Sequence, residues 1–193
     1  MAGLCFCVQC VKGLMNRWIV LLRGVNVSGK NKLPMADFRA ALYEAGFSKV
    51  QSYIQSGNVI LEAKVGQSRE DVSIAVQAVL AKNFDIETSL MILTEAQLKV
   101  AAQANPLGQE FEKPNWVFLF FLAQAPVSPN LETLKDITTE NERWELRGDV
   151  FYVFAGDGAG RSKLIARAEK LLGVSATARN WKTVKKLIEM TDG

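Results

Sequence analysis

The sequence contains no histidine, and its three cysteines all lie within the first ten residues. Without imidazole, the chain cannot use Ser–His or Cys–His catalysis, histidine metal ligation or imidazole acid–base chemistry. Cys5, Cys7 and Cys10 have no second cluster of ligands with which to complete a tetrahedral metal site. From the sequence we therefore assign no metal, no cofactor and no catalytic residue.

Long apolar runs are missing as well. The longest, residues 117–123, is far shorter than the roughly 20 residues of a membrane-spanning helix. No basic segment precedes the apolar residues near the N-terminus and no clear cleavage site follows them, which argues against a signal peptide. We therefore expect no association with a membrane. Because residues 15–193 contain no cysteine, there is no sign of a disulfide scaffold, and we expect a cytoplasmic protein.

The first 14 residues hold all the cysteines, and they precede a second methionine, Met15. The first apolar strand, expected over 18–22, follows that methionine directly. We therefore interpret residues 1–14 as an N-terminal extension that is not part of the fold.

One order of elements is predicted twice: strand, helix, strand, tight turn, strand, helix, strand. In the first half the strands are expected over 18–22, 50–54, 59–61 and 90–93, with helices over 35–45 and after the cap Ser68. In the second half they are expected over 116–122, 145–146, 150–154 and 176–178, with helices over 128–137 and 161–172. The turns Gly57-Asn58 and Gly148-Asp149 look alike, and such steps favour hairpins.

This pattern is the split βαβ arrangement, so we predict an α+β fold of two tandem ferredoxin-like (βαββαβ) units packed together, with antiparallel sheets and helices on one face. The units are residues 15–94 and 115–193. Between them, residues 95–114 form a helix opened by a capping box at Thr94, followed by a linker. A final helix, which begins at Trp181 after the cap Asn180, belongs to the second unit.

The net charge of +3 conceals a segregation of charge along the chain. Residues 16–33 carry four basic side chains and no acidic one, and residues 158–188 carry eight basic side chains against Glu169 alone. Residues 95–157 carry five basic and ten acidic side chains. Two segments so basic suggest an anionic partner, although two solvated faces would give the same composition.

Residues Gly24 to Lys30 match the phosphate-loop pattern G-x-x-x-x-G-K directly after an apolar strand. Asn31 stands where a Ser or Thr would bind Mg²⁺. Pro34 delays the helix, so Lys30 would not lie at a helix N-terminus. An anion-binding loop that uses Lys30 and backbone amides is therefore favoured over nucleotide hydrolysis.

The second half partly matches the RNA-recognition motif, in which aromatic side chains on the central strands stack on bases. Arg147-Gly148, Phe151 and Phe154 fit that pattern, whereas Asp149 replaces an aromatic residue. The strand that begins at Asn58 in the first half has no aromatic residue. We therefore interpret Phe118, Phe120, Phe151 and Tyr152 as core residues or as a covered sheet face, and Trp181 as an anchor of the last helix or a stacking partner.

Three stretches carry a family resemblance: 22–32 with Pro34-Met35, 53–59 and 176–183. Together they resemble the bacterial family labelled domain of unknown function 1697, over about residues 15–190. That family has no established activity. The resemblance implies a tandem α+β fold and a shared set of polar positions, which in this chain are Arg23, Asn26, Lys30, Gln55, Ser56, Asn58, Arg179 and Asn180.

These observations favour a protein that binds an anionic ligand, either a phosphate-bearing small molecule or a nucleic acid. The candidate ligand-binding residues are Arg23, Asn26, Lys30, Lys32, Gln55, Ser56, Asn58, Arg161, Arg179, Asn180 and Lys182. Arg23, Lys30 and Arg179 are expected to converge on one electropositive region, and alanine at the two arginines is expected to change stability little.

Two alternatives remain open at this point. One is an enzyme that acts on a small phosphorylated or carboxylated substrate, with Lys30 or Arg23 stabilising the developing charge. The other is a module for protein interaction or assembly. The sequence does not specify the oligomeric state.

Overall fold

Two four-stranded antiparallel sheets form the framework of the protein in the computed structural model, which describes residues 15–27, 31–107 and 113–192. The first sheet has the strand order β2-β3-β1-β4 and the second has the order β6-β7-β5-β8. The strands are β1 (Met15–Leu22), β2 (Ser48–Tyr53), β3 (Asn58–Lys64), β4 (Leu90–Thr94), β5 (Val117–Leu122), β6 (Glu142–Arg147), β7 (Val150–Ala155) and β8 (Ala176–Asn180).

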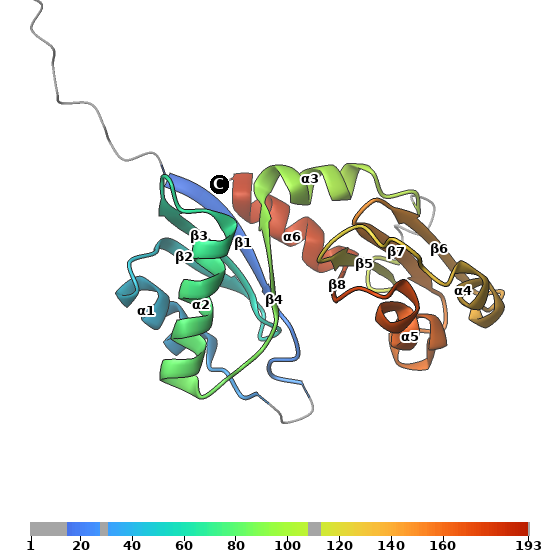
Figure 1. Cartoon of the computed structure of the whole chain (residues 1–193), viewed down its shortest axis with the longest axis horizontal. Helices are drawn as coiled ribbons and strands as arrows, with labels where there is room; N and C mark the ends of the chain where they lie inside the picture. The colour runs from blue at the N-terminus through green and yellow to red at the C-terminus, as the bar shows by residue number, and fades with distance from the viewer. Residues whose placement is uncertain (1–14, 28–30, 108–112, 193) are drawn as a thin grey trace, which may run out of the picture.

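The helices occupy both faces of the sheets (Figure 1). They are α1 (Met35–Glu44), α2 (Arg69–Phe84), α3 (Glu95–Gln103), α4 (Leu131–Ile137), α5 (Lys163–Leu172) and α6 (Trp181–Asp192). Helices α1 and α2 pack on the outer face of the first sheet, and α4 and α5 on the outer face of the second. Helices α3 and α6 lie between the two sheets, so the first sheet and the second sheet each have helices on both faces and not on one face as predicted. The prediction of an α+β fold with antiparallel sheets is confirmed.

The predicted helix starts agree with the observed ones where a single capping side chain determines the first residue of the helix. Ser68 opens α2 through a capping box with Asp71, and the hydrogen bonds from Ser68 lower the pKa of that aspartate. Thr94 and Gln97 form the expected capping box at α3. The side chain of Asn180 accepts a hydrogen bond from the first turn of α6, as expected for its cap.

Helix α4 begins later than predicted. The expected start was residue 128, with the proline at 129 in the first turn. Instead the side chain of Asn130 accepts a hydrogen bond of 2.9 Å from the amide of Thr133, and the helix runs from Leu131. Asparagine is a strong N-cap, so it fixes the boundary here. In the described residues no helix is long and apolar enough to cross a membrane.

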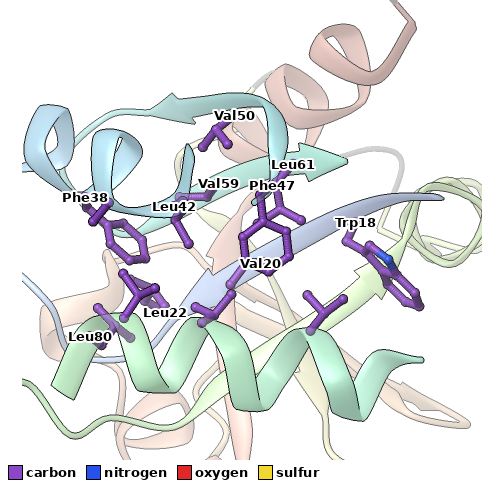
Figure 2. Close-up of a cluster of buried hydrophobic side chains, with 14 of the residues drawn as sticks. Trp18, Val20, Leu22, Phe38, Leu42, Phe47, Val50, Val59, Leu61 and Leu80 are labelled. Atoms are coloured by element: carbon purple, nitrogen blue, oxygen red, sulfur yellow. The ribbon is translucent and has the colours of Figure 1, made fainter. Parts of the chain in front are cut away.

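Strand β1 is buried on both of its faces, which explains its continuous apolar sequence. Trp18, Val20 and Leu22 point into an outer core with α1 and α2 (Figure 2). Ile19 and Leu21, on the opposite face, belong to a second core that also contains side chains of α3, α6 and the second sheet. A single strand therefore contributes to two cores because successive side chains alternate between faces.

The inner core covers the sheet face that an RNA-recognition motif would expose. Tyr152 is 1% exposed and packs there with Leu119 and Trp181. Phe151 and Phe120 lie in the outer core of the second sheet. The interpretation of these aromatic residues as core is thus confirmed, and no open face with stacking aromatics is formed by the described residues.

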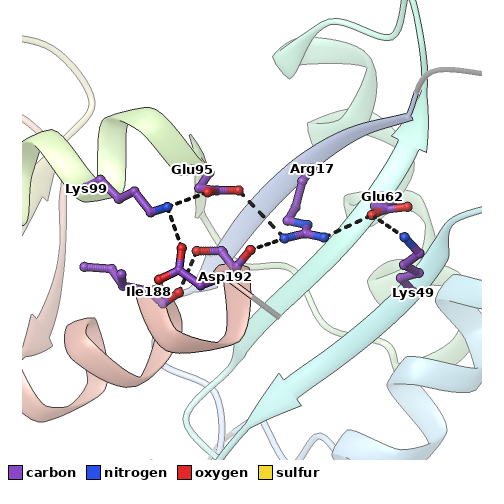
Figure 3. A network of polar contacts seen from close by, with 8 residues as sticks. Arg17, Lys49, Glu62, Glu95, Lys99, Ile188 and Asp192 are labelled. Atoms are coloured by element: carbon purple, nitrogen blue, oxygen red, sulfur yellow. Dashed lines mark hydrogen bonds and ion pairs between the residues drawn. The ribbon is translucent and has the colours of Figure 1, made fainter.

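A chain of ion pairs joins the end of α6 to the first sheet (Figure 3). Arg17 of β1 donates a hydrogen bond to the carbonyl of Thr191 and lies 3.4 Å from Glu62 of β3. Lys99 of α3 lies 2.6 Å from Asp192. Pairs at the surface, such as Lys99–Asp192, stabilise a fold only weakly, whereas the side chains of Arg17 and Glu62 are only 28% and 10% exposed. The last helix of the chain is therefore fastened to the first unit.

The registers of the two central strands can be aligned residue by residue. Leu22 donates its amide hydrogen to the carbonyl of Gly57, and Leu122 donates to the carbonyl of Asp149. Gly57 therefore corresponds to Asp149. The expected pairing of Gly57-Asn58 with Gly148-Asp149 is wrong by one position, because the β2–β3 connection, residues 54–57, is longer than the two-residue β6–β7 turn.

Replacing Tyr152 by Phe is expected to lower the free energy of unfolding by about 1 kcal/mol at neutral pH, because the hydroxyl donates a 2.8 Å hydrogen bond to the buried carbonyl of Ala101. Burial raises the pKa of Tyr152 to about 12. A folded-state pKa above the ordinary value of about 10 gives a stabilisation that is complete below pH 10 and is lost towards pH 12.

The wild type should therefore lose its advantage over the Tyr152→Phe variant and become the less stable of the two as the pH rises from about 10 to 12, because a pKa raised from 10 to about 12 represents a larger free energy than one hydrogen bond. Urea titrations of both proteins across this range measure the difference. A difference that stays constant would show that Tyr152 does not titrate from a buried site.

Candidate functional site

The three sequence stretches meet where β1 ends, at the β2–β3 turn and in β8. Arg179 of β8 lies at the centre. Its guanidinium donates hydrogen bonds to carbonyl oxygens of the first unit, at 2.7 Å from Leu22, 3.3 Å from Ser56 and 3.4 Å from Gly57. Its Nε donates to the side-chain oxygen of Asn58. Arg179 of β8 thus binds the last two residues of the β2–β3 turn, the first residue of β3 and the last residue of β1.

Asn58 is fully buried and its side chain is fully used. Its amide nitrogen donates to the carbonyl of Tyr53 at 3.1 Å and to the hydroxyl of Ser56 at 2.9 Å, while its oxygen accepts from Arg179. A buried amide must find such partners, because leaving it unpaired costs about 1–3 kcal/mol. Asn58 therefore closes the turn on the inside and presents its oxygen to the arginine.

Burial lowers the pKa of Arg179 to about 10, so the guanidinium keeps its charge at neutral pH. Another of its hydrogen bonds, 2.8 Å, goes to the carbonyl of Ala178. Arg179 is thus a partly buried link between the two sheets. The expectation that alanine at this position leaves stability almost unchanged is not compatible with these contacts.

Asn26, which follows β1, links Leu33 to the same turn. Its backbone is left-handed, with φ of 54°, a conformation that asparagine tolerates better than most residues. The side-chain amide donates to the carbonyls of Leu33 at 2.8 Å and Gln55 at 2.7 Å, and the side-chain oxygen accepts from the amide of Leu33. The side chain of Asn26 therefore contacts both Leu33 and the β2–β3 turn.

Arg23, at the end of β1, faces the second unit. Its guanidinium forms a two-pronged ion pair with Glu169 of α5, with one Nη1–Oε1 distance of 2.6 Å. Beside this pair is a depression of about 290 Å³ whose lining includes Gly24, Thr177 and Arg179. Two of the predicted binding residues, Arg23 and Arg179, thus line one cavity between the units.

The other predicted residues are distributed around this junction. Ser56 and Gln55 belong to the turn itself, and Asn180 caps α6. Lys32, Arg161 and Lys182 are exposed, and among the described residues their side chains form no hydrogen bond or ion pair with the other candidates. Lys30 lies outside the described residues, as do Cys5, Cys7 and Cys10 and the proposed extension 1–14.

Two lining residues were missed by the sequence analysis. Glu169 is the sole acid among residues 158–188, and an isolated acid in a basic segment is a usable indication of an ion pair. Thr177 lies in the third family stretch, two residues before Arg179 and thus on the same face of β8. Both line the depression.

Comparisons with known proteins agree with the resemblance read from the sequence. The chain belongs to the family described as "Protein of unknown function (DUF1697)", whose model matches residues 15–152. The match begins at the first residue of β1 and ends in β7, before Arg179. A comparison with functionally curated proteins finds no match.

Among solved structures, the chain is similar to the conserved bacterial protein SP0830 from Streptococcus pneumoniae. The two share 25% sequence identity and superpose with a TM-score of 0.71. The alignment covers 93% of this chain and 100% of that one. The relative therefore has the same overall architecture over its full length.

Proposed function

We propose that the protein binds a small phosphate-bearing molecule in the depression between the two units, with Arg23 as its main charged ligand. The observation that carries this proposal is the convergence of Arg23 and Arg179 on one cavity of about 290 Å³. Arg23 is the more available of the two, because its side chain is 45% exposed and its one ion-pair partner is itself at the surface. A guanidinium fork suits phosphate oxygens as well as it suits a carboxylate.

In this proposal the carboxylate of Glu169 occupies the position on Arg23 that the phosphate would take. It occupies the fork of Arg23 from across the junction, so an anion must compete with it. The hydroxyl of Thr177 lines the same cavity and has no hydrogen-bond partner among the described residues, which leaves it free to donate to a phosphate oxygen. The backbone of Gly24 is accessible to an anion, because the space that a Cβ would occupy there has no other atom within 4 Å.

A small molecule fits this cavity better than a nucleic acid does. The inner sheet faces are covered by α3 and α6, so the bases of an RNA strand would find no aromatic platform on the described residues. Lys32, Arg161 and Lys182 would serve as outlying charges that raise the local concentration of anions.

The proposal predicts opposite effects for the two members of the ion pair. Arg23→Ala should abolish the binding of inorganic phosphate, because it removes the charged fork. Glu169→Gln should raise the affinity several-fold, because it removes the competing charge and keeps the shape. Isothermal titration at low salt measures both, and Lys163→Ala on the exposed side of α5 is a matched control for general charge.

Equal losses in the Lys163 and Arg23 variants, with a steep salt dependence, would indicate diffuse binding of a polyanion such as RNA instead. No binding of phosphate by the wild type or by the Glu169 variant would contradict the proposal. The arginines would then serve only the junction, which is the assembly alternative.

We further propose that the units, residues 15–94 and 115–193, are duplicated ferredoxin-like modules joined by residues 95–114. The matching strand orders and the equivalent amide bonds of Leu22 and Leu122 support this. In this scheme the junction is the boundary between the modules, where binding sites often form.

A further inference from the structure

A second cavity, separate from the phosphate site, lies between α3 and the second sheet. Its volume is about 260 Å³. An engineered apolar cavity of about 150 Å³ is large enough for benzene, so this one can hold a ring with a short side arm. The walls that give it its apolar character are Leu93, Val100, Ala101, Phe121, Val150 and Tyr152.

The cavity draws its walls from both units, as binding cavities commonly do. Val100 of α3 is 63% exposed, so one wall is accessible from solvent. The hydroxyl of Tyr152 is fixed by its hydrogen bond to Ala101. The cavity is therefore bounded by the fixed side chain of Tyr152 on one side and is accessible from solvent beside Val100 of α3.

Two charged residues, Arg147 at the end of β6 and Asp149 in the β6–β7 turn, also line the cavity. They are not equivalent. Arg147 is already neutralised by Glu145, with its Nε 2.6 Å from a carboxylate oxygen, and it also donates to the carbonyl of Ala104 at 2.7 Å. The side chain of Asp149 makes no hydrogen bond and no ion pair with any residue that the structure describes. Because Glu145 pairs with Arg147, the unpaired charge of the lining is the negative charge of the exposed Asp149.

We propose that this cavity binds a small apolar molecule that carries a protonated amine, with the apolar body between α3 and β7 and the ammonium group on Asp149. The ammonium supplies a positively charged partner for Asp149, since Arg147 is already paired with Glu145, and the apolar body removes the walls from water.

The test compares three probes of one shape on the full chain: 2-phenylethylamine, 2-phenylethanol and 3-phenylpropionate. We expect 2-phenylethylamine to bind about three-fold more tightly than the alcohol, the size of effect that an ion pair with an exposed carboxylate such as Asp149 provides, and 3-phenylpropionate to bind least. Amide chemical shifts of Ala101 and Val150 report whether a probe occupies the cavity.

Asp149→Asn keeps the size of the side chain and the turn, and it should reduce the affinity for the amine to that for the alcohol. Asp136→Asn, an exposed carboxylate of α4 that does not line the cavity, is the matched control and should leave all three affinities unchanged. Equal binding of the amine and the alcohol, an amine affinity that survives Asp149→Asn, or shifts confined to other parts of the chain would each overturn the proposal.

Discussion

Replacing Arg179 by Ala is expected to lower the free energy of unfolding by about 3 kcal/mol, the range found when one partner of a buried charged network is removed. The variant loses hydrogen bonds to the carbonyls of Leu22, Ser56 and Gly57. It also leaves the side-chain oxygen of Asn58 buried without its donor. Urea denaturation followed by circular dichroism measures the change.

Arg23→Ala is the control for this experiment. Arg23 also joins the two units, but its ion pair with Glu169 is exposed, so its loss should cost no more than about 1 kcal/mol. If both alanine variants unfold at the same urea concentration as the wild type, Arg179 does not hold the junction together. A large loss of unfolding free energy in the Arg23 variant alone would show that Arg23, and not Arg179, holds the junction together.

Gly57→Ala is expected to destabilise the fold by about 3 kcal/mol, as the sum of backbone strain and overpacking. Gly57 has φ of +72°, and a Cβ there would lie 2.6 Å from a methyl carbon of Val25 and 2.7 Å from the Cβ of Leu22. Neither neighbour can give way easily, because both side chains are buried. The turn would therefore move away from β1 and from Arg179.

Gly148→Ala separates the two causes. Gly148 also has a positive φ, +56°, but a Cβ there would meet nothing within 4 Å. Its alanine variant should lose only about 1 kcal/mol, the cost of the left-handed backbone. Thermal unfolding of both variants gives the comparison, and equal losses would contradict the close packing of the β2–β3 turn on β1.

Local features of the fold were predictable from the sequence, because one or two neighbouring side chains determine them. Ser68 and Thr94 fixed two helix starts through capping boxes, and the apolar run of β1 identified a central strand. The start of α4 was misplaced because the proline suggested an earlier turn, while Asn130 made the stronger cap.

The site was less predictable, because its main contacts are distant in sequence. Arg179 was identified as a candidate from its motif, but its partners are mostly main-chain carbonyls more than 120 positions away. Backbone carbonyls occur at every residue, so no pattern of side chains reveals which of them an arginine will reach. The same reasoning applies to α3 and α6, whose place between the sheets depends on tertiary packing.

The most direct test of the central claim follows the arginine side chains themselves. Titration of the wild type with inorganic phosphate at low salt, observed through the Nε–H resonances of Arg23 and Arg179, reports on both proposed roles in one experiment. We expect the Arg23 resonance to shift to saturation as phosphate displaces Glu169, while that of Arg179, held by Asn58, stays in place. An Arg23 resonance that does not move, or arginine resonances that all move alike, would contradict the account.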